Sequence, residues 1–466
     1  MTEPVFSLLP RPKPMALAGK RVLVLGLGDT GLAVARWVER SGGSVRVADT
    51  RSAPPRAADL RSGELVTGPF DARLLAGIDL VCISPGLALS GPVVQQVLAR
   101  GVPLVGEIEL FAWQVRGGPA AKIAAVTGTN GKTTVTALTG HLLRSAGVDC
   151  EVAGNIGPAA LDALMRRLDA GRAPAAWVLE LSSYQLETTW SLAPDCAALL
   201  NLTEDHLDRY AGLAEYGAAK ARIFHGAGTQ VLNREDPRAA ALAPAGGRRI
   251  SFGLDAPPRA EDFGIATVAG RKWLAHGART LIAAGELPIH GWHNAANALA
   301  AAALASALGA PAGAIVEGLR SFHGLPHRLE RVALAGGVAW YDDSKGTNVG
   351  ATIAALRGLD EKVVLIAGGE GKGQDFAPLA QPVAERASRV LLIGRDAPLI
   401  ARALAASGVP LETCATLEEA VAVAARSARP GEAVLLSPAC ASFDMFRDYR
   451  HRGDVFAAAV RGLARG

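Results

Sequence analysis

The sequence contains few cysteines, and those it has stand apart from one another. The five are Cys82, Cys150, Cys196, Cys414 and Cys440, and no two of them form a Cys-x-x-Cys pair. A small, odd and dispersed set argues against a disulfide framework and against a zinc site, and it indicates a reducing compartment. We therefore expect a cytoplasmic protein.

Long apolar runs and long basic runs are missing as well. The longest apolar tract, at 295–310, is mostly alanine and too short to span a bilayer, so it predicts a buried helix. Prolines at positions 4, 10, 12 and 14 interrupt the N-terminal segment, where a signal peptide needs a continuous apolar stretch. The net charge is only +4, and no block of lysine and arginine is long enough to follow a nucleic acid. We therefore expect neither a membrane nor a nucleic-acid partner.

A short apolar run, a glycine turn and a helical pattern follow one another repeatedly along the chain. Examples of the apolar runs are 21–26, 122–128 and 176–183. This order is typical of βαβ units and predicts an α/β protein with mainly parallel sheets. At ~150 residues per domain, a chain of 466 residues predicts about three domains. A Gly-Gly-Pro break at 117–119 and the segment 325–330 mark the expected boundaries.

A first glycine-rich loop, GLGDTG at 26–31, follows the first predicted strand and opens a helix, and Asp49 ends the next strand. In that context the glycines admit a pyrophosphate, the helix N-terminus receives it, and the acid binds a ribose hydroxyl. The loop therefore predicts a nucleotide site, with NAD as one possible ligand. The same glycines could also serve only a tight strand-to-helix turn. Arg51 and the turn SPG at 84–86 would reach the same crevice.

A second loop, GTNGKTT at 128–134, lies between a predicted strand and a predicted helix. It has the Gly-Lys-Thr end of a P-loop, although Val126 stands where the common spacing has glycine. Backbone N–H groups would face phosphates, Lys132 would reach the outer phosphates, and the Thr133 hydroxyl would bind Mg²⁺. The loop therefore predicts an ATP site.

Three further residues are candidates for chemistry near the second loop. Glu180 ends a buried apolar run, where a carboxylate is costly unless it meets a cation, so it favours a magnesium ligand. His206 is by itself more typical of a structural or capping histidine, and Lys220 of an ordinary helix lysine.

Taken together, these stretches resemble the Mur ligase family over nearly the whole chain after the proline-rich N-terminal segment. The shared stretches are GLGDTG, DTR, SPG, GTNGKTT, GNIG, LELSSYQLE, NLTEDHLDRY, AAKARI, HNAAN, GLPHRLE, DDSKGTN, GGEGKG and LLSPACASFDMF. The resemblance implies a UDP-sugar-binding Rossmann-like domain at 1–118 with a flexible leader at 1–18. It implies a central ATP-binding P-loop domain with a mainly parallel sheet at 119–325. A C-terminal amino-acid-binding Rossmann-like domain would follow at 326–466.

The resemblance also implies an activity, in which the first loop holds a UDP-sugar and the second holds ATP. It implies a magnesium-dependent ligase that adds D-glutamate to UDP-N-acetylmuramoyl-L-alanine during peptidoglycan synthesis. We expect a monomer. Ligases that add L-alanine or a diamino acid, and folylpolyglutamate synthetases, are alternatives within the same chemistry. An NAD-dependent oxidoreductase and a non-catalytic nucleotide-binding regulator are alternatives from other classes.

The resemblance assigns a role to each of the following residues, including several that the two loops already indicate. The ATP-binding residues would be Gly128, Thr129, Asn130, Gly131, Lys132, Thr133, Thr134, Asn294, Asn297, Arg328, Asp343 and Lys345. The UDP-substrate residues would be Gly28, Asp29, Thr30, Asp49, Thr50, Arg51, Ser84, Gly86, Asn155 and His206. The D-glutamate residues would be Thr347, Lys372, Ser442, Phe443 and Tyr449. The metal ligands would be Thr133, Glu180, His206 and Lys220 as a carbamate, and the catalytic residues Lys132, Glu180, His206, Lys220 and Lys345. Two positions depart from the family pattern: Glu370 replaces an expected Asp, and Tyr449 an expected Phe.

Overall fold

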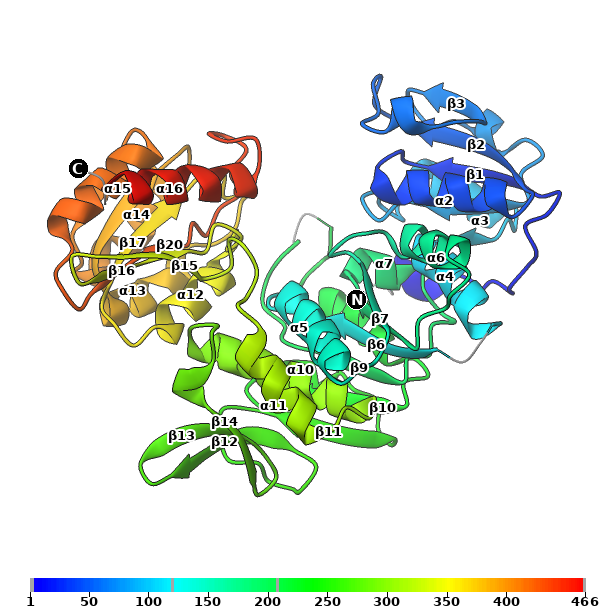
Figure 1. Cartoon of the computed structure of the whole chain (residues 1–466). Coiled ribbons are helices and arrows are strands. Elements are labelled where there is room, and N and C mark those ends of the chain that lie inside the picture. Colours follow the sequence, from blue (N-terminus) through cyan, green and yellow to red (C-terminus); the bar gives the residue numbers. More distant parts are fainter. Residues whose placement is uncertain (1–3, 119–120, 207–208, 464–466) are drawn as a thin grey trace. The chain divides into compact units, whose positions relative to one another are not determined.

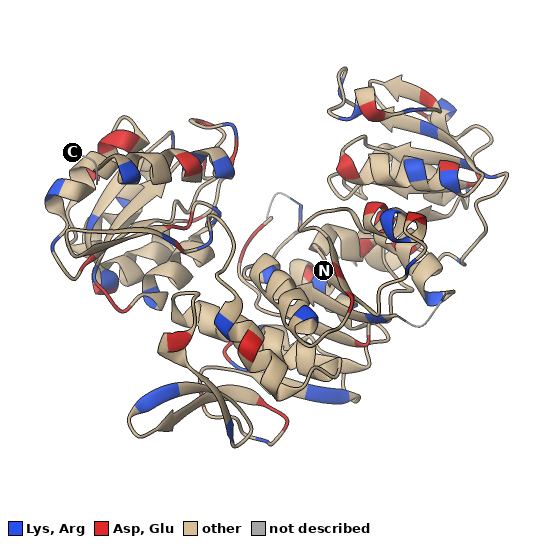
Figure 2. Ribbon diagram, viewed as in Figure 1, with Lys and Arg blue, Asp and Glu red and all other residues tan. Residues whose placement is uncertain are grey.

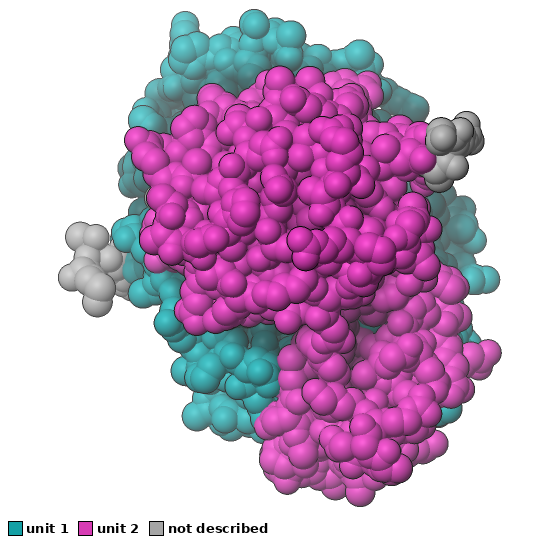
Figure 3. Space-filling view, turned by 90° about the vertical axis from the view of Figure 1, so that its left-hand side faces the viewer, with its two compact units in different colours: residues 1–202, 206–252, 300–315 teal, residues 203–205, 253–299, 316–466 magenta. Residues whose placement is uncertain are grey.

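The computed structural model describes residues 4–118, 121–206 and 209–463. It divides into two compact units, which Figure 3 distinguishes by colour. Unit 1 comprises residues 1–202, 206–252 and 300–315, and unit 2 comprises residues 203–205, 253–299 and 316–466. None of the helices in the described part of the chain has the length and hydropathy that crossing a membrane requires.

The first sheet, in unit 1, is parallel throughout and has the strand order β3-β2-β1-β4-β5. Its strands are β1 (Arg21–Leu25), β2 (Ser44–Asp49), β3 (Glu64–Thr67), β4 (Leu80–Ile83) and β5 (Leu104–Val105). The accompanying helices are α2 (Asp29–Arg40), α3 (Pro92–Ala99) and α4 (Glu107–Arg116) (Figure 1). After the exposed Arg21 that begins β1, the strands β1 and β4 are apolar and buried, as expected where both faces of a sheet are covered. The order reverses between β1 and β4, and open α/β sheets bind ligands at the carboxyl ends of the strands where such a reversal occurs.

The second sheet contributes six parallel strands to unit 1, in the order β11-β10-β9-β6-β8-β7. They are β6 (Lys122–Thr127), β7 (Cys150–Gly154), β8 (Ala176–Glu180), β9 (Cys196–Leu199), β10 (Thr229–Asn233) and β11 (Arg248–Phe252). Its helices are α5 (Lys132–Ser145), α6 (Ala160–Asp169), α7 (Ser183–Glu187), α8 (Leu213–Ala221) and α9 (Pro237–Ala241). The alanine-rich tract forms α10 (Trp292–Ala307), followed by α11 (Ala312–Ser321). Residues 298–304 are fully buried, which confirms the predicted buried helix.

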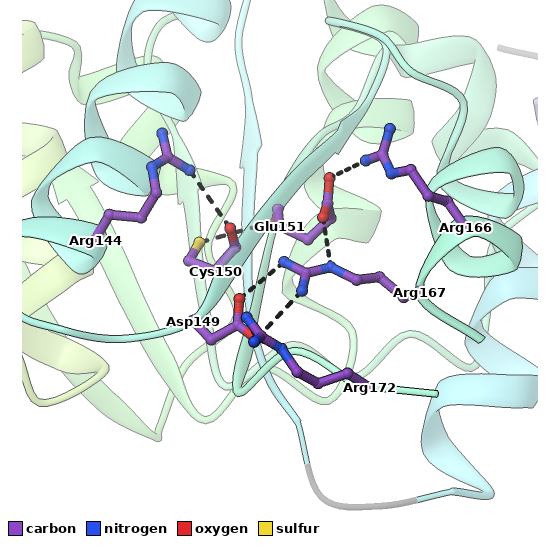
Figure 4. A network of polar contacts seen from close by, with 7 residues as sticks. All are labelled: Arg144, Asp149, Cys150, Glu151, Arg166, Arg167 and Arg172. Carbon is purple, nitrogen blue, oxygen red and sulfur yellow. Dashed lines mark hydrogen bonds and ion pairs between the residues drawn. The ribbon is translucent and has the colours of Figure 1, made fainter. Parts of the chain in front are cut away.

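A network of ion pairs fixes α6 to the start of β7 (Figure 4). Arg167 donates to Asp149 at 2.9 Å and to Glu151 at 2.6 Å. Arg166 also pairs with Glu151, and Arg172 pairs with Asp149 at 3.0 Å. Exposed pairs contribute little one at a time, but Arg167 and Glu151 are largely buried, and each has two ionic partners. The network therefore fixes the position of α6 against the start of β7, the strand that leads to Asn155.

Unit 2 contains a meander of three antiparallel strands and a third sheet. The meander consists of β12 (Phe263–Val268), β13 (Arg271–His276) and β14 (Arg279–Ala283). The third sheet has the order β15-β16-β20-β17-β18-β19 and is parallel except for β15. Its strands are β15 (Glu330–Ala335), β16 (Val338–Asp342), β17 (Val363–Gly368), β18 (Ala387–Ile393), β19 (Leu411–Thr413) and β20 (Ala433–Leu436). Its helices are α12 (Val349–Gly358), α13 (Ala380–Arg386), α14 (Ala397–Leu404), α15 (Leu417–Ser427) and α16 (Tyr449–Leu463). Separate apolar cores lie on its two faces.

The remaining elements are short. They are helix α1 (Val5–Leu8) and the 3₁₀ turns η1 (Ala57–Asp59), η2 (Ala72–Leu75), η3 (Arg222–Phe224), η4 (Ala284–Glu286), η5 (Ala377–Leu379) and η6 (Ala405–Ser407). Figure 2 shows both signs of charge interspersed along helices such as α2 and α6. The predicted α/β class with three mainly parallel sheets is confirmed, whereas the antiparallel meander had no counterpart among the predicted elements.

Candidate active site

The first glycine loop connects β1 to α2 as predicted. Gly26 has a φ of +89°, and a side chain on Gly31 would clash with the Gly26 carbonyl oxygen, so both positions require glycine. Gly28 faces open space at the N-terminus of α2, which leaves its backbone accessible to a ligand. Ser84, just beyond β4, donates from its hydroxyl to the Gly26 carbonyl at 3.0 Å. The loop is therefore braced from the neighbouring strand.

Asp49 organises this loop from the end of β2. Its buried carboxylate accepts hydrogen bonds from the Leu27 N–H at 2.7 Å and from the Arg51 side chain at 2.7 and 2.9 Å. The bond from Arg51, with those from backbone N–H groups, holds the pKa of Asp49 well below its usual range, against the effect of burial. The lowered pKa favours the ionised carboxylate, and its partner Arg51 has a side chain that is half exposed.

The other residues expected around the UDP-sugar follow the same strand ends. Asp29 and Thr30 begin α2, Thr50 follows β2, and Gly86 follows β4. Asp29 pairs with Arg56 at 3.4 Å. These residues therefore share one edge of the first sheet, at the reversal of strand order. Their assignment to a UDP-sugar remains a prediction.

The second loop connects β6 to α5 with the backbone geometry of a phosphate loop. Gly131 has a φ of +81° and precedes the first turn of α5. The Lys132 ammonium folds back over the loop and donates to the carbonyl oxygens of Gly128 and Thr129 at 2.9 and 2.8 Å. Asn201 braces the loop from the end of β9, because its side chain accepts from the Asn130 N–H at 2.8 Å and donates to the Asn130 carbonyl at 3.0 Å.

Sequence reasoning assigned no role to Asn201. The available signal was its position, because it lies just beyond the carboxyl end of a parallel strand, where such sheets bind ligands.

Glu180 is buried at the end of β8, beside the strand that leads into the P-loop. One carboxylate oxygen, Oε1, accepts from the Asn155 amide at 2.6 Å. The other, Oε2, is buried and has no hydrogen-bond partner among the described residues. A buried carboxylate oxygen without a partner is costly, and a hard cation such as Mg²⁺ satisfies it. Glu180 and the Thr133 hydroxyl are therefore suitable groups for a magnesium ion held together with ATP phosphates.

Lys220 approaches the same loop from α8. Its side chain is buried, its ammonium donates to the Gly128 carbonyl at 2.8 Å, and it lies 4.5 Å from the centre of the Tyr216 ring. His206 is exposed and has a φ of +56°, and its ring lies 4.9 Å from that of Tyr184. Lys132 and Lys220 thus share one carbonyl oxygen as a partner, which places two cationic side chains at the P-loop.

Unit 2 holds a second group of predicted residues, at the carboxyl ends of β16 and β20. Burial raises the pKa of Asp343 to about 7, although its carboxylate accepts from the Ser437 hydroxyl at 2.8 Å. The Lys345 ammonium lies 4.0 Å from the centre of the Tyr449 ring. The buried guanidinium of Arg452 fixes the turn between these residues by donating to the hydroxyl and carbonyl oxygens of Ser344. Sequence reasoning assigned no role to Arg452.

His327 joins this turn to the segment that enters β15. It has a φ of +62°, donates from its N–H to Glu330 at 3.0 Å, and its ring lies 2.7 Å from the Asp342 carboxylate. Its carbonyl accepts from the Lys345 N–H at 3.1 Å. In the described part of the chain, His327, Glu330 and Asp342 are the one group of three potential metal-ligating side chains. Their mutual hydrogen bonds account for the grouping.

Two of the residues expected to bind ATP, Asn294 and Asn297, belong to the start of α10. Asn294 is buried and donates to the His290 carbonyl at 2.8 Å, and Asn297 donates to the Asn294 side chain at 3.0 Å. Both are part of unit 2, as are Arg328, which follows His327, and the turn that holds Asp343.

The residues expected to bind D-glutamate follow three strands of the third sheet. Lys372 is exposed with a φ of +52°, Ser442 is buried, and Phe443 is 65% exposed. Thr347 donates from its N–H to the Lys345 carbonyl at 2.8 Å. Glu370, which replaces the Asp expected from the family pattern, forms an ion pair with Arg395 at 3.3 Å. Its backbone forms a β-bridge with that of Ala441. Their role in binding an amino acid remains a prediction.

Comparison with known proteins places the whole chain in one family. Family models match in three successive parts: "Mur ligase MurD-like, N-terminal domain" at 20–106, "Mur ligase middle domain" at 126–305 and "Mur ligase, glutamate ligase domain" at 327–440. A protein of Nitrosospira multiformis called UDP-N-acetylmuramoylalanine--D-glutamate ligase is 56% identical over 457 residues, covering 96% of this chain and 97% of the relative. One of the same name from Nitrosomonas europaea is 52% identical over 461 residues, covering 97% of this chain and 98% of the relative.

Solved structures share the fold. MurF from Acinetobacter baumannii has a TM-score of 0.60 at 20% identity, covering 96% of this chain and 91% of that one. The UDP-N-acetylmuramate-alanine ligase MurC from Thermotoga maritima has a TM-score of 0.59 at 20% identity, covering 96% of this chain and 100% of that one. The full-length relatives and the three successive domains lead to one conclusion: the chain belongs to the Mur ligase family.

Proposed function

We propose that this protein joins D-glutamate to the alanine carboxylate of UDP-N-acetylmuramoyl-L-alanine, using ATP and releasing ADP and phosphate. The observation that carries the proposal is the match, over 96% of the chain, to relatives named for that reaction. The activity belongs to peptidoglycan precursor synthesis, and we expect a cytoplasmic monomer.

The proposed reaction has two steps. An oxygen of the alanine carboxylate attacks the γ-phosphorus of ATP, the bond to the bridging oxygen breaks, and ADP leaves. The D-glutamate amine then attacks the carbonyl carbon of the acyl phosphate, loses a proton, and expels phosphate from a tetrahedral intermediate. The substrate carboxylate is the nucleophile, so no Ser, Cys or Asp of the protein needs to be one.

The P-loop supplies positive charge for the first step. Lys132, which donates to two loop carbonyls, would turn its ammonium to the ATP phosphates, and the N–H groups at the start of α5 would receive them. Thr133, Glu180, His206 and Lys220 as a carbamate would hold magnesium, and Glu180 has a buried oxygen for it that lacks a hydrogen-bond partner in the described part of the chain. The ion would neutralise charge on the transferring phosphoryl group.

Lys220 would act as a carbamate formed from its amine and carbon dioxide with loss of a proton. The reaction requires the neutral amine, the form that burial favours. A carbamate nitrogen keeps one N–H, so the bond to the Gly128 carbonyl can persist while the new oxygens face the metal. We predict that Lys220→Ala lowers kcat at least about 100-fold and that a short carboxylic acid restores part of it. Unchanged turnover in Lys220→Ala would contradict this role.

In the third domain, the proposed site for D-glutamate must bind two carboxylates. Lys372 offers a cation, and Thr347, Ser442 and the backbone N–H groups near Phe443 and Tyr449 offer neutral donors. Asp343 and Lys345 would serve the nucleotide. Together these groups match a diacid better than a neutral amino acid.

The test is phosphate release from Mg-ATP with UDP-N-acetylmuramoyl-L-alanine and one amino acid at a time: D-glutamate, L-glutamate, L-alanine or diaminopimelate. Release with D-glutamate alone, and a product heavier by one glutamyl residue, is the expected result. Release with another amino acid would retain the ligase and reject the substrate. A change in absorbance at 340 nm with NADH, and no phosphate release, would instead favour an oxidoreductase at the first loop.

A further inference from the structure

The N-terminal segment packs against unit 1 through one apolar face. Phe6 and Leu9, one helical turn apart, are 5% and 6% exposed, whereas Leu8 between them is 61% exposed. Phe6 and Leu9 belong to one apolar core with residues of the first and second sheets. The segment is thus an integral part of unit 1, and the proposed reaction gives it no role.

Phe6 covers an arginine of the central domain. The Arg222 guanidinium lies 6.0 Å from the centre of the Phe6 ring and 5.2 Å from that of the Trp190 ring, so it lies near two aromatic side chains. Burial lowers the pKa of Arg222, and the carboxylates of Glu109 and Glu187 oppose this effect. Cation–π contacts are stronger when the cation is removed from water.

Arg222 ties two helices of the site together. It stands at the C-terminal end of α8, and it donates to the carbonyl oxygens of Leu186 at 2.7 Å and Thr189 at 2.8 Å. The Leu186 carbonyl lies in the last turn of α7 and also accepts from the Thr189 N–H at 3.3 Å, and Thr189 follows the helix. One guanidinium therefore fixes the end of α8 to the end of α7.

The loop after α7 is fixed from a second side. The buried Glu109 carboxylate of α4 accepts from the N–H groups of Trp190 and Ser191 at 2.6 and 2.9 Å. The backbone of Trp190, one of the two aromatic residues near the guanidinium, is therefore fixed by hydrogen bonds. The other aromatic residue, Phe6, comes from the N-terminal segment.

Lys220 stands two residues before Arg222, in the last turn of α8. We infer that Phe6 and Arg222 are positioning residues for Lys220: the N-terminal segment covers the guanidinium that anchors α8, and this anchor holds the Lys220 nitrogen at the Gly128 carbonyl. The catalytic consequence rests on the proposed function. The structural consequence, that Phe6 helps to hold the C-terminal end of α8, does not rest on the proposed function.

The test compares Phe6→Ala with Leu8→Ala, an exposed neighbour on the same helix. Amide hydrogen exchange at residues 213–224 should become about fivefold faster in Phe6→Ala, because a cation–π contact accounts for a factor of about that size. In Leu8→Ala it should stay unchanged. Exchange in β17 of unit 2 should not change in either. In the assay, kcat should fall about fivefold with Phe6→Ala while KM for the UDP-sugar stays constant.

Arg222→Met decides whether Phe6 acts through the guanidinium. In that background, adding Phe6→Ala should have almost no further effect on exchange or kcat, because the coupled partner is gone. Phe6→Leu, which keeps an apolar side chain, should show an intermediate effect on exchange.

Three results would overturn the inference: independent, multiplicative effects of the two substitutions, faster exchange throughout unit 1, or wild-type behaviour of Phe6→Ala. Exchange needs no turnover, so it decides the positioning of α8 even if the ligase assay fails. Such a failure would count against the proposed function alone.

Discussion

Glu180→Gln should separate stability from activity, because Glu180 carries a cost in the folded protein that a bound cation would remove. Its Oε2 atom is buried without a hydrogen-bond partner among the described residues, and an unsatisfied buried group of this kind costs about 1–3 kcal/mol. Glutamine keeps the shape and the bond to Asn155 but removes the charge. The free energy of unfolding without ligand should therefore stay equal or rise by about 1 kcal/mol. Loss of a metal ligand should lower kcat about 1000-fold, equivalent to about 4 kcal/mol.

The assay is thermal unfolding with and without Mg-ATP, followed by phosphate release. At 100 times its Kd, Mg-ATP should stabilise the wild type by about 2.7 kcal/mol, and this gain should shrink in Glu180→Gln. Glu109→Gln is the matched control, because the Glu109 carboxylate is equally buried but accepts four hydrogen bonds. In Glu109→Gln, the amide NH₂ group would replace a carboxylate oxygen that accepts hydrogen bonds, so donors would face a donor. The substitution should therefore lower the free energy of unfolding by about 1–3 kcal/mol. A Glu180→Gln protein that is less stable, or that retains kcat within threefold, would refute the reasoning.

Three further predictions follow from the loops and the turn of the third domain. Gly31→Ala should weaken binding of UDP-N-acetylmuramoyl-L-alanine at least about tenfold in calorimetry, because the methyl group would clash with the Gly26 carbonyl; unchanged affinity would contradict this. Lys132→Ala should lower kcat about 100- to 1000-fold in phosphate release, and a value within threefold of wild type would reject the P-loop role. The bond to Asp342 raises the pKa of His327 above 6.5, so the pair stabilises fully below pH 6.5 and less as the pH rises through the raised pKa. Asp342→Asn should flatten this part of the pH dependence of urea unfolding, and an unaltered slope between pH 5.5 and 8.5 would exclude the pair as its source.

Local patterns predicted most of the framework. Continuous apolar runs identified β1, β6 and β8 because strands buried on both faces read as unbroken hydrophobic stretches. Candidate residues such as Glu180 were found because parallel sheets bind ligands at the carboxyl ends of their strands. The meander β12–β14 was missed because its strands are partly exposed and carry only a weak apolar pattern.

The residues that support the site could not be found from local patterns, since their partners are remote in the chain. Asn201 binds the P-loop across 71 positions, and Glu109 binds the loop after α7 across 81. Phe6 contacts Arg222 from the far end of the same unit's sequence. Such contacts depend on the packing of complete domains, and local sequence patterns do not reveal that packing.

The most direct test of the account follows one oxygen atom. With UDP-N-acetylmuramoyl-L-alanine labelled with ¹⁸O in its alanine carboxylate, attack on the γ-phosphorus transfers one labelled oxygen to the phosphate that the amine later expels. We predict one ¹⁸O per phosphate released in the presence of D-glutamate, measured by mass spectrometry, and none in ADP. Phosphate without label, or label in a released nucleotide, would contradict an acyl phosphate and with it the proposed roles of Lys132 and Glu180.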